Sequence, residues 1–441
     1  MSTIEKHDMT QGKILLPLVS FTIPLVLGNL FQLTYNAADS VIVGKYVGEQ
    51  ALAAVGTSTP IMNIAILLIS GMCMGASVLM SSQYGAKDYD TLSRQISTTM
   101  LAGCGFSVVF SLLMLLLANP VLRLIRVPET AIPEAAAYLR IIFMGLIFTF
   151  MYNFLANTMR ALGDSKTPLY FLVTSAFLNI FGDLFFVVVL RWGVAGSAIA
   201  TVFSEGLCCL LCGIYIKKKI PLLCLGKKWW VFDKSLLGKT VSYGSTSAMQ
   251  QVCLQLGKLI IQSVVNTQGV AVMAAFTAVN RVDDFAYTPQ QNIGHAMTTF
   301  LAQNKGAGHK ERMKKGFQTG LLIELVYSIG LFCVIWGLAP QIMTLFAEDG
   351  DAQVVSLGIS YLHLISWMYI LPGLTNGVQG FFRGIGDLKV TLYSTFMNMF
   401  GRVVAVFVMI RLLQMEFASL AWANMVGWIA VSYTHLTLPT T

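Results

Sequence analysis

The chain has 441 residues, of which 56% are hydrophobic and only 11% are charged. Soluble globular domains carry roughly 25% charged residues, so this composition excludes a soluble domain and predicts an integral membrane protein. The formal charge is +8, from 29 basic and 21 acidic residues. Whether that excess indicates nucleic acid or membrane depends on where the basic residues lie.

Twelve apolar runs follow one another along the chain, each near the roughly 20 residues that a membrane-spanning helix needs. They cover residues 14–43, 51–80, 96–118, 138–159, 168–190, 193–216, 241–265, 272–302, 317–346, 355–380, 390–412 and 416–432. No cleavable signal is expected before the first run, because MSTIEKHDMTQGK is short and polar. The runs predict an all-α integral membrane protein with twelve transmembrane helices.

Basic residues gather on one side of this pattern. If the N-terminus is cytoplasmic and the runs alternate in direction, 20 of the 29 basic residues face the cytoplasm, five face outward and four lie within runs. The positive-inside rule then predicts a protein of the plasma or inner membrane with both termini in the cytoplasm. Anionic membrane lipid, and not nucleic acid, is the expected partner of these residues.

The two halves of the chain repeat one another at an offset of about 221 residues. The segment QYGA at 83–86 matches NKGA at 304–307, and RALGDSKTPLY at 160–170 matches RGIGDLKVTLY at 383–393. An even number of helices in each repeat predicts two parallel, pseudo-symmetric six-helix lobes. We expect lobes at 1–216 and 240–431, a basic cytoplasmic linker at 217–239, and a non-native tail at 432–441 that truncates the last helix.

The first run carries four polar side chains on one helical face, at steps of three, four and three residues: Asn29, Gln32, Asn36 and Asp39. Such a stripe should face a wet cavity, and Pro24 before it can bend the helix.

The fifth and sixth runs each offer a further pair of polar groups four residues apart. Asn179 pairs with Asp183, and Thr201 with Glu205. These oxygen atoms suit a proton relay or a hard cation such as sodium. For Glu205 and Asn36, a buried polar group bonded to a neighbouring helix is an equal alternative.

The second half is not a chemical copy of the first. Asp39 aligns with Ile260, and Lys258 and Gln255 lie nearby. Without a gap Asn179 meets Arg402, whereas a one-turn gap places Arg402 opposite Asp183. Cation chemistry is therefore expected in the first lobe.

Three further acidic positions in the second half stay open or are interpreted as structural. Asp283 and Asp284 either form a local ion pair with Arg281 or contact substrate. Glu324, a lone acid on an apolar helix, is interpreted as structural.

These motifs together resemble the multidrug and toxic compound extrusion (MATE) family of secondary transporters. The resemblance rests on YNAADSVIVGKYVG, NTMRALGD, the N-x-x-x-D of the fifth run and RGIGD, and it extends over about residues 10 to 431. It implies an antiporter that exports organic, often cationic, amphipathic compounds in exchange for protons or sodium. The ion-coupling residues that it implies are Asp39, Asn157, Asn179, Asp183 and Thr201.

The substrate-cavity candidates come from the polar positions described above. They are Asn29, Gln32, Asn36, Glu205, Gln255, Lys258, Asp283, Asp284 and Arg402. A transient sodium ion at Asp39, Asn179 and Asp183 is the one metal expected. We expect a monomer with small organic substrates and no cofactor.

Three alternatives remain. A flippase for lipid-linked sugars shares the superfold, but should line its cavity with basic residues. A channel or receptor would not need two matching lobes with unlike acids. An enzyme is disfavoured because the chain has no nucleotide loop, nucleophile motif or metal cluster; the C-x-x-C of Cys209 and Cys212 has no second pair.

Overall fold

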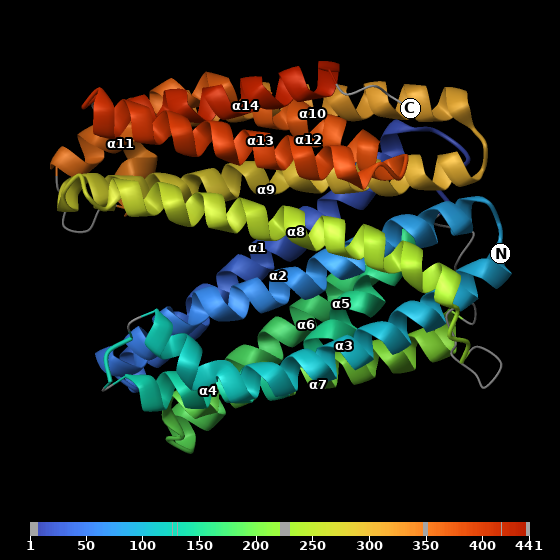
Figure 1. Cartoon of the computed structure of the whole chain (residues 1–441), viewed down its shortest axis with the longest axis horizontal. Coiled ribbons are helices and arrows are strands. Elements are labelled where there is room, and N and C mark those ends of the chain that lie inside the picture. Colours follow the sequence, from blue (N-terminus) through green and yellow to red (C-terminus); the bar gives the residue numbers. More distant parts are fainter. Residues whose placement is uncertain are drawn as a thin grey trace. The chain divides into compact units, whose positions relative to one another are not determined.

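The computed structural model describes residues 8–125, 127–129, 131–220, 230–346, 352–415 and 417–437 (Figure 1). Every regular element in these residues is helical, which confirms the predicted all-α class. The elements are α1 (Leu15–Tyr46), α2 (Glu49–Gly85), α3 (Tyr89–Leu124), α4 (Ile132–Met144), α5 (Leu146–Ala161), α6 (Lys166–Asp183), η2 (Leu184–Val189), α7 (Gly193–Lys219), α8 (Lys234–Val265), α9 (Val270–Gly306), α10 (Lys310–Phe346), α11 (Ala352–Ser366), η6 (Trp367–Tyr369), α12 (Ile370–Gly384), α13 (Leu388–Phe407), η7 (Val408–Leu412) and α14 (Ser419–Thr437).

The predicted runs all fall on these helices, and several observed spans are interrupted. Helices α4 and α5 meet at Gly145 with a bend of 46°. The fifth and eleventh runs end in the π-helical segments η2 and η7, and the tenth contains the 3₁₀ turn η6. By length and composition, eight helices of the described residues could cross a membrane, or nine if the bent pair is one span.

The chain forms two compact units. The first consists mainly of Ile23–Ala248, and the second of Met9–Thr22 with Met249–Thr441. The short N-terminal segment is held in the second unit because the Arg312 guanidinium donates to the carbonyls of Met9, Gln11 and Gly12. The predicted boundaries at 216, 239 and 431 stay predictions. Residues 221–229 of the linker and 438–441 of the tail lie outside the described residues, and α14 continues through Thr437.

The backbone shows the repeat directly. A left-handed residue recurs at matching places in both halves, in the turns that begin or end equivalent helices. The pairs are Gly48 with Gly269, Lys87 with Gly308, Gly163 with Gly386, and Arg191 with Gln414. The last two pairs share an offset of 223, so no gap falls between them. The ungapped alignment therefore holds, and Arg402 is the counterpart of Asn179.

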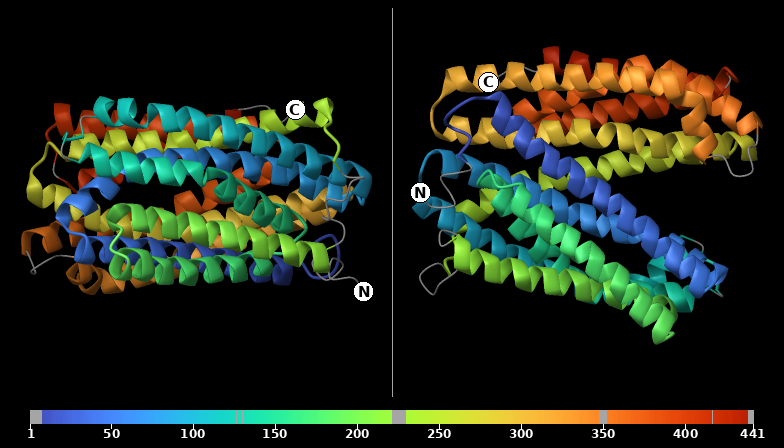
Figure 2. Two further views of the ribbon diagram at one scale, coloured as in Figure 1. Left: turned by 90° about the horizontal axis from the view of Figure 1, so that it is seen from below. Right: turned by 180° about the vertical axis from the view of Figure 1, so that it is seen from behind.

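Within each unit the long helices run side by side in a bundle (Figure 2). The first core packs aromatic side chains of α4 and α5 against α2 and α3; Phe150 fits beside Gly103, where a Cβ atom would lie 1.9 Å from its ring. In the second core, Tyr361 and Tyr369 are fully buried among α9, α10 and α11. Glycines bring α12 close to α9, since a Cβ on Gly380 would lie 2.6 Å from the Gly294 carbonyl oxygen.

Candidate ion-coupling site

Three helices of the first unit carry the candidate site. Asp39 lies near the end of α1, Asp183 is the last residue of α6, and Thr201 lies on α7, which packs against α6. The helical periodicity that placed Asn179 with Asp183 on one face is confirmed, because both side chains are buried.

Hydroxyl groups of α7 connect the site. The Ser197 hydroxyl donates to Asp39 Oδ1 at 2.7 Å. One turn later, Thr201 Oγ1 donates to the Ser197 carbonyl oxygen at 3.2 Å and accepts from Asn179 Nδ2 at 3.2 Å. A continuous line of polar groups therefore joins α1, α7 and α6.

In the described part of the chain, Asp183 has no hydrogen bond that offsets the cost of burying its carboxyl group. Its side chain is 0% exposed, and neither carboxylate oxygen has a hydrogen-bond partner among the described residues. The Asn179 Oδ1 atom beside it is likewise buried and unpaired. The carboxyl groups of Asp39 and Asp183 are near enough to interact directly. Two carboxylates cannot hydrogen-bond to each other unless a proton lies between them, and a small cation can take the same place.

Glu205 is held separately on α7. Its Oε2 atom accepts from the Thr149 hydroxyl of α5 at 2.5 Å. This hydrogen bond supports the alternative that Glu205 is a buried polar group bonded to a neighbouring helix. The Tyr35 hydroxyl also lies near Glu205 and forms a hydrogen bond with the Gln32 side chain. The Tyr138 hydroxyl, on α4, lies near Asp39, Asp183 and Glu205 and interacts with their charges.

The remaining first-unit candidates are placed less centrally. Asn29, Gln32 and Asn36 are exposed on α1. Asn157 is half-buried on α5, and its amide donates to the Asn153 carbonyl oxygen of its own helix at 2.9 Å. No hydrogen bond in the described residues joins Asn157 to either acid.

The second-unit candidates form other contacts. Lys258 Nζ lies 3.0 Å from Asp284 Oδ1, with both side chains exposed. Asp283 is buried and accepts from the Tyr369 hydroxyl at 2.5 Å. Within the described residues, neither acid forms the ion pair with Arg281 that was one of the two alternatives, and the cation beside Asp284 comes instead from the neighbouring helix α8. Gln255 and Arg402 are half-buried.

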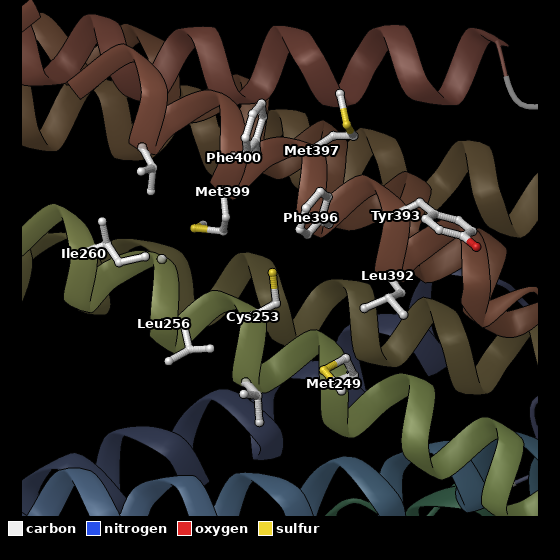
Figure 3. A pocket seen from close by; sticks show the side chains of 13 residues that line it. Met249, Cys253, Leu256, Ile260, Leu392, Tyr393, Phe396, Met397, Met399 and Phe400 are labelled. Carbon is white, nitrogen blue, oxygen red and sulfur yellow. The ribbon is translucent and has the colours of Figure 1, made fainter. Parts of the chain in front are cut away.

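An apolar pocket of about 760 Å³ opens in the second unit between α8 and α13 (Figure 3). Met249, Cys253 and Leu256 line it from α8. Phe396 and Phe400 line it from α13, and no residue of the lining is charged. Its volume falls within the roughly 300–1,000 Å³ range of small-molecule sites.

Sequence reasoning missed Ser197, Tyr138 and Thr149, which contact or approach the acids. Serine and threonine in membrane helices commonly bond to their own backbone, so their sequence positions gave no signal. Among the described residues, no group of three or more His, Cys, Asp or Glu could hold a metal ion. A sodium ion would therefore depend on the two aspartates with amide and hydroxyl oxygens.

The MatE family model matches residues 24–185 and 247–432, which is most of the chain and both units. The chain belongs to the MATE family of multidrug efflux transporters. The match fits the two-lobe, twelve-helix arrangement, and it makes the protein a multi-pass membrane transporter.

Individual relatives agree with this family. Probable multidrug resistance protein YpnP of Bacillus subtilis is 32% identical over 392 residues, covering 88% of this chain and 86% of the relative. Probable multidrug resistance protein NorM of Thermotoga maritima is 23% identical and covers 93% and 88% of the two chains. A solved transporter of the MOP superfamily from Pyrococcus furiosus superposes with a TM-score of 0.91 at 22% identity, covering 99% and 97%. This last similarity confirms the fold.

Proposed function

We propose that this MATE transporter is an antiporter that exports organic, often cationic, amphipathic compounds in exchange for a proton or sodium. The observation that carries the proposal is the interacting pair Asp39 and Asp183, which has no basic partner among the described residues. An acid within the membrane is costly, so a coupling cation is the partner that the arrangement lacks.

The proposed cycle depends on competition for this negative charge. When the site opens outward, a proton or sodium neutralises Asp39 and Asp183 and lowers the affinity for a bound organic cation, which leaves. The loaded protein then opens inward, releases the ion, and regains the charge that attracts the next substrate. Only one of the two ligands is bound at high affinity at a time, so the two fluxes are linked.

The substrate would bind along surfaces that suit an amphipathic molecule. The exposed side-chain amides of Asn29, Gln32 and Asn36 lie on α1, the helix that carries Asp39, and can form hydrogen bonds with a substrate. Within the second unit, the pocket between α8 and α13 is a separate apolar surface, and the flexible side chains of Met249 and Met399 can repack around substrates of different shapes.

The membrane orientation is part of the proposal. Because most basic residues fall on one side of the alternating spans, we place both termini in the cytoplasm and the protein in the plasma or inner membrane. We further propose that it acts as a monomer. The flippase alternative is weakened by Lys258, which is already paired with Asp284 and is thus not free to bind a pyrophosphate.

Efflux of a fluorescent organic cation tests the function. Cells making the wild type are compared at equal membrane abundance with Asp39→Asn and Asp183→Asn, while the proton and sodium gradients are collapsed in turn. Asp90→Asn is the matched control, since it removes an exposed acid in the first turn of α3 that belongs to neither candidate set. We expect both site variants to lose efflux, the control to retain it, and one gradient to be required.

Two results would refute the proposal. Equal efflux by wild type and both site variants would make the acids structural. Efflux that persists after both gradients are collapsed would exclude ion coupling.

A further inference from the structure

A second unpaired acid lies in the second unit, on α10. Glu324 is 0% exposed, and neither of its carboxylate oxygens has a hydrogen-bond partner among the described residues. None of the ion pairs in that part of the chain involves it. Glutamate is almost never fully buried unless it is paired, so this position needs an explanation other than packing.

The polar groups around Glu324 border one small space beside Gly373 of α12. A Cβ atom on Gly373 would lie 2.8 Å from Ser328 Oγ, 3.1 Å from Gln290 Nε2 and 3.4 Å from Glu324 Oε2. The side-chain oxygen of Gln290 is also buried without a partner. Two helices, α9 and α10, thus direct polar side-chain atoms to the space beside Gly373 of α12, which is too tight to hold a methyl group without displacing them.

This space adjoins a break in the tenth span. Between α11 and α12 the chain passes through the 3₁₀ turn η6, and Gly373 follows four residues after Tyr369. The Tyr369 carbonyl oxygen accepts from Gln290 Nε2 at 2.8 Å and from Ser328 Oγ at 3.4 Å. Short 3₁₀ stretches within a helix often mark functional hinges. The hydrogen bonds at the break are therefore made by the same residues that border the space.

Other titratable groups face this region without pairing with Glu324. From α9 come Asp283 and Tyr287, and from η6 comes Tyr369, whose hydroxyl bonds to Asp283. On α10 itself, the Tyr327 hydroxyl donates to the Ala286 carbonyl oxygen at 3.1 Å.

Two basic side chains lie on the remaining elements packed against α10. His363 of α11 stacks near Trp336, and Arg383 of α12 lies beside His295. Neither is within ion-pair distance of Glu324.

We propose that Glu324 is a proton-binding site of the transporter, separate from the Asp39–Asp183 pair. In the arrangement seen here the carboxyl group is neutral, because an ionised carboxylate without partners would be strongly disfavoured in the membrane interior. When η6 shifts, water entering the space beside Gly373 solvates the group and it releases the proton. Gln290 presents its NH₂ group to the space, which favours a proton over sodium as the ligand. The inference rests on the proposed antiport only for its link to transport.

Infrared difference spectroscopy of the purified protein in lipid nanodiscs tests the site without any transport. The carboxylic-acid carbonyl band is recorded from about pH 5 to about pH 9, the range in which buried glutamates titrate. Wild type is compared with Glu324→Gln, in sodium and in potassium buffer. We expect one titrating carboxyl band to be lost in the variant, at the same pH in both salts.

A second variant guards against misfolding of the first. Gly373→Ala fills the space and leaves Glu324 in place, so we expect the band to remain but no longer to titrate. Gly330→Ala, on the same α10 and with no atom within 4 Å of the added Cβ, is the control that should titrate like wild type.

Four outcomes decide whether Glu324 binds a proton, binds sodium or is a structural group. A band that never titrates in wild type, or an identical titration in wild type and Glu324→Gln, would overturn the inference and make Glu324 a structural group. A titration that shifts with sodium would replace the proton by sodium as the ligand, and would also overturn it. If wild type exports no dye but the band titrates as expected, the antiport proposal fails and the proton site stands.

Discussion

Ser197→Ala isolates one hydrogen bond of the candidate ion site. In the wild type the Ser197 hydroxyl donates to Asp39 Oδ1 at 2.7 Å, a bond that stabilises the ionised carboxylate more than the protonated carboxyl group. Hydrogen bonds to charged groups contribute about 1.5–3 kcal/mol. Asp39 is half-exposed, so water replaces part of the lost bond and the lower end of the range applies, about 1.5 kcal/mol.

A change of about 1.4 kcal/mol corresponds to a factor of ten in a binding constant. A coupling proton should therefore bind about tenfold more tightly to the Ser197→Ala protein. Efflux of a fluorescent cation, measured against the concentration of the coupling ion, should reach half of its maximum at about one-tenth of the wild-type ion concentration. The maximal rate should fall, because the ion leaves more slowly on the inner side.

Two controls make this result specific. Ser204→Ala removes a buried hydroxyl group from the same helix. In the described residues this hydroxyl donates to the Thr201 carbonyl oxygen of its own helix, so the substitution should leave the ion dependence of efflux unchanged. Adding Ser197→Ala to Asp39→Asn should have no further effect on ion binding. An unchanged half-saturating concentration in the single variant, or equal shifts for both serines, would refute the assigned role of Ser197.

Two further predictions concern stability, measured by denaturation of the purified protein. Gly75→Ala should lower the free energy of unfolding by about 2 kcal/mol, since overpacking costs about 1–3 kcal/mol. The added Cβ atom would lie 2.4 Å from the Tyr243 carbonyl oxygen. Gly213→Ala is the control and should not lower the free energy of unfolding, because no atom lies within 4 Å of its added Cβ. Asp88→Ala should cost about 1 kcal/mol at neutral pH through loss of the α3 N-cap bond to Thr91. Because that bond lowers the pKa of Asp88, the difference should persist above the unfolded-chain pKa of about 3.9 and vanish as pH falls through the lower folded value. A Gly75→Ala protein as stable as the control, or a pH-independent effect at Asp88, would contradict these accounts.

The helices could be predicted from the sequence because each needs about 20 apolar residues, a signal that depends on no other part of the chain. Their interruptions could not. The bend between α4 and α5 falls at Gly145, where a Cβ atom would lie 2.4 Å from Val202 of α7. A glycine is required at position 145 because of Val202, which is distant in sequence. The residues next to Gly145 in the sequence do not distinguish it from the other glycines of the chain.

The acids of the first unit were predictable for an energetic reason. A carboxylate inside an apolar helix is expensive wherever its neighbours lie, so Asp39 and Asp183 were conspicuous. Their partners were not, because Ser197 contacts Asp39 across 158 residues of sequence. The same limitation applies to Asp284, because the ion-pair alternative considered only Arg281 of its own helix and could not find Lys258 on α8.

Comparison of the two units indicates that Asp183 is kept for its chemistry. At the offset of 223, its counterpart is Val406, which is buried in the apolar core of the second unit just before η7. Both units thus build a π-helical segment near this point: η2 begins directly after Asp183, and η7 begins two residues after Val406. The backbone does not need a carboxylate here, and an apolar residue packs well in the equivalent position. An acid that the fold does not require, and that the membrane disfavours, supports the proposal that Asp183 binds the coupling cation.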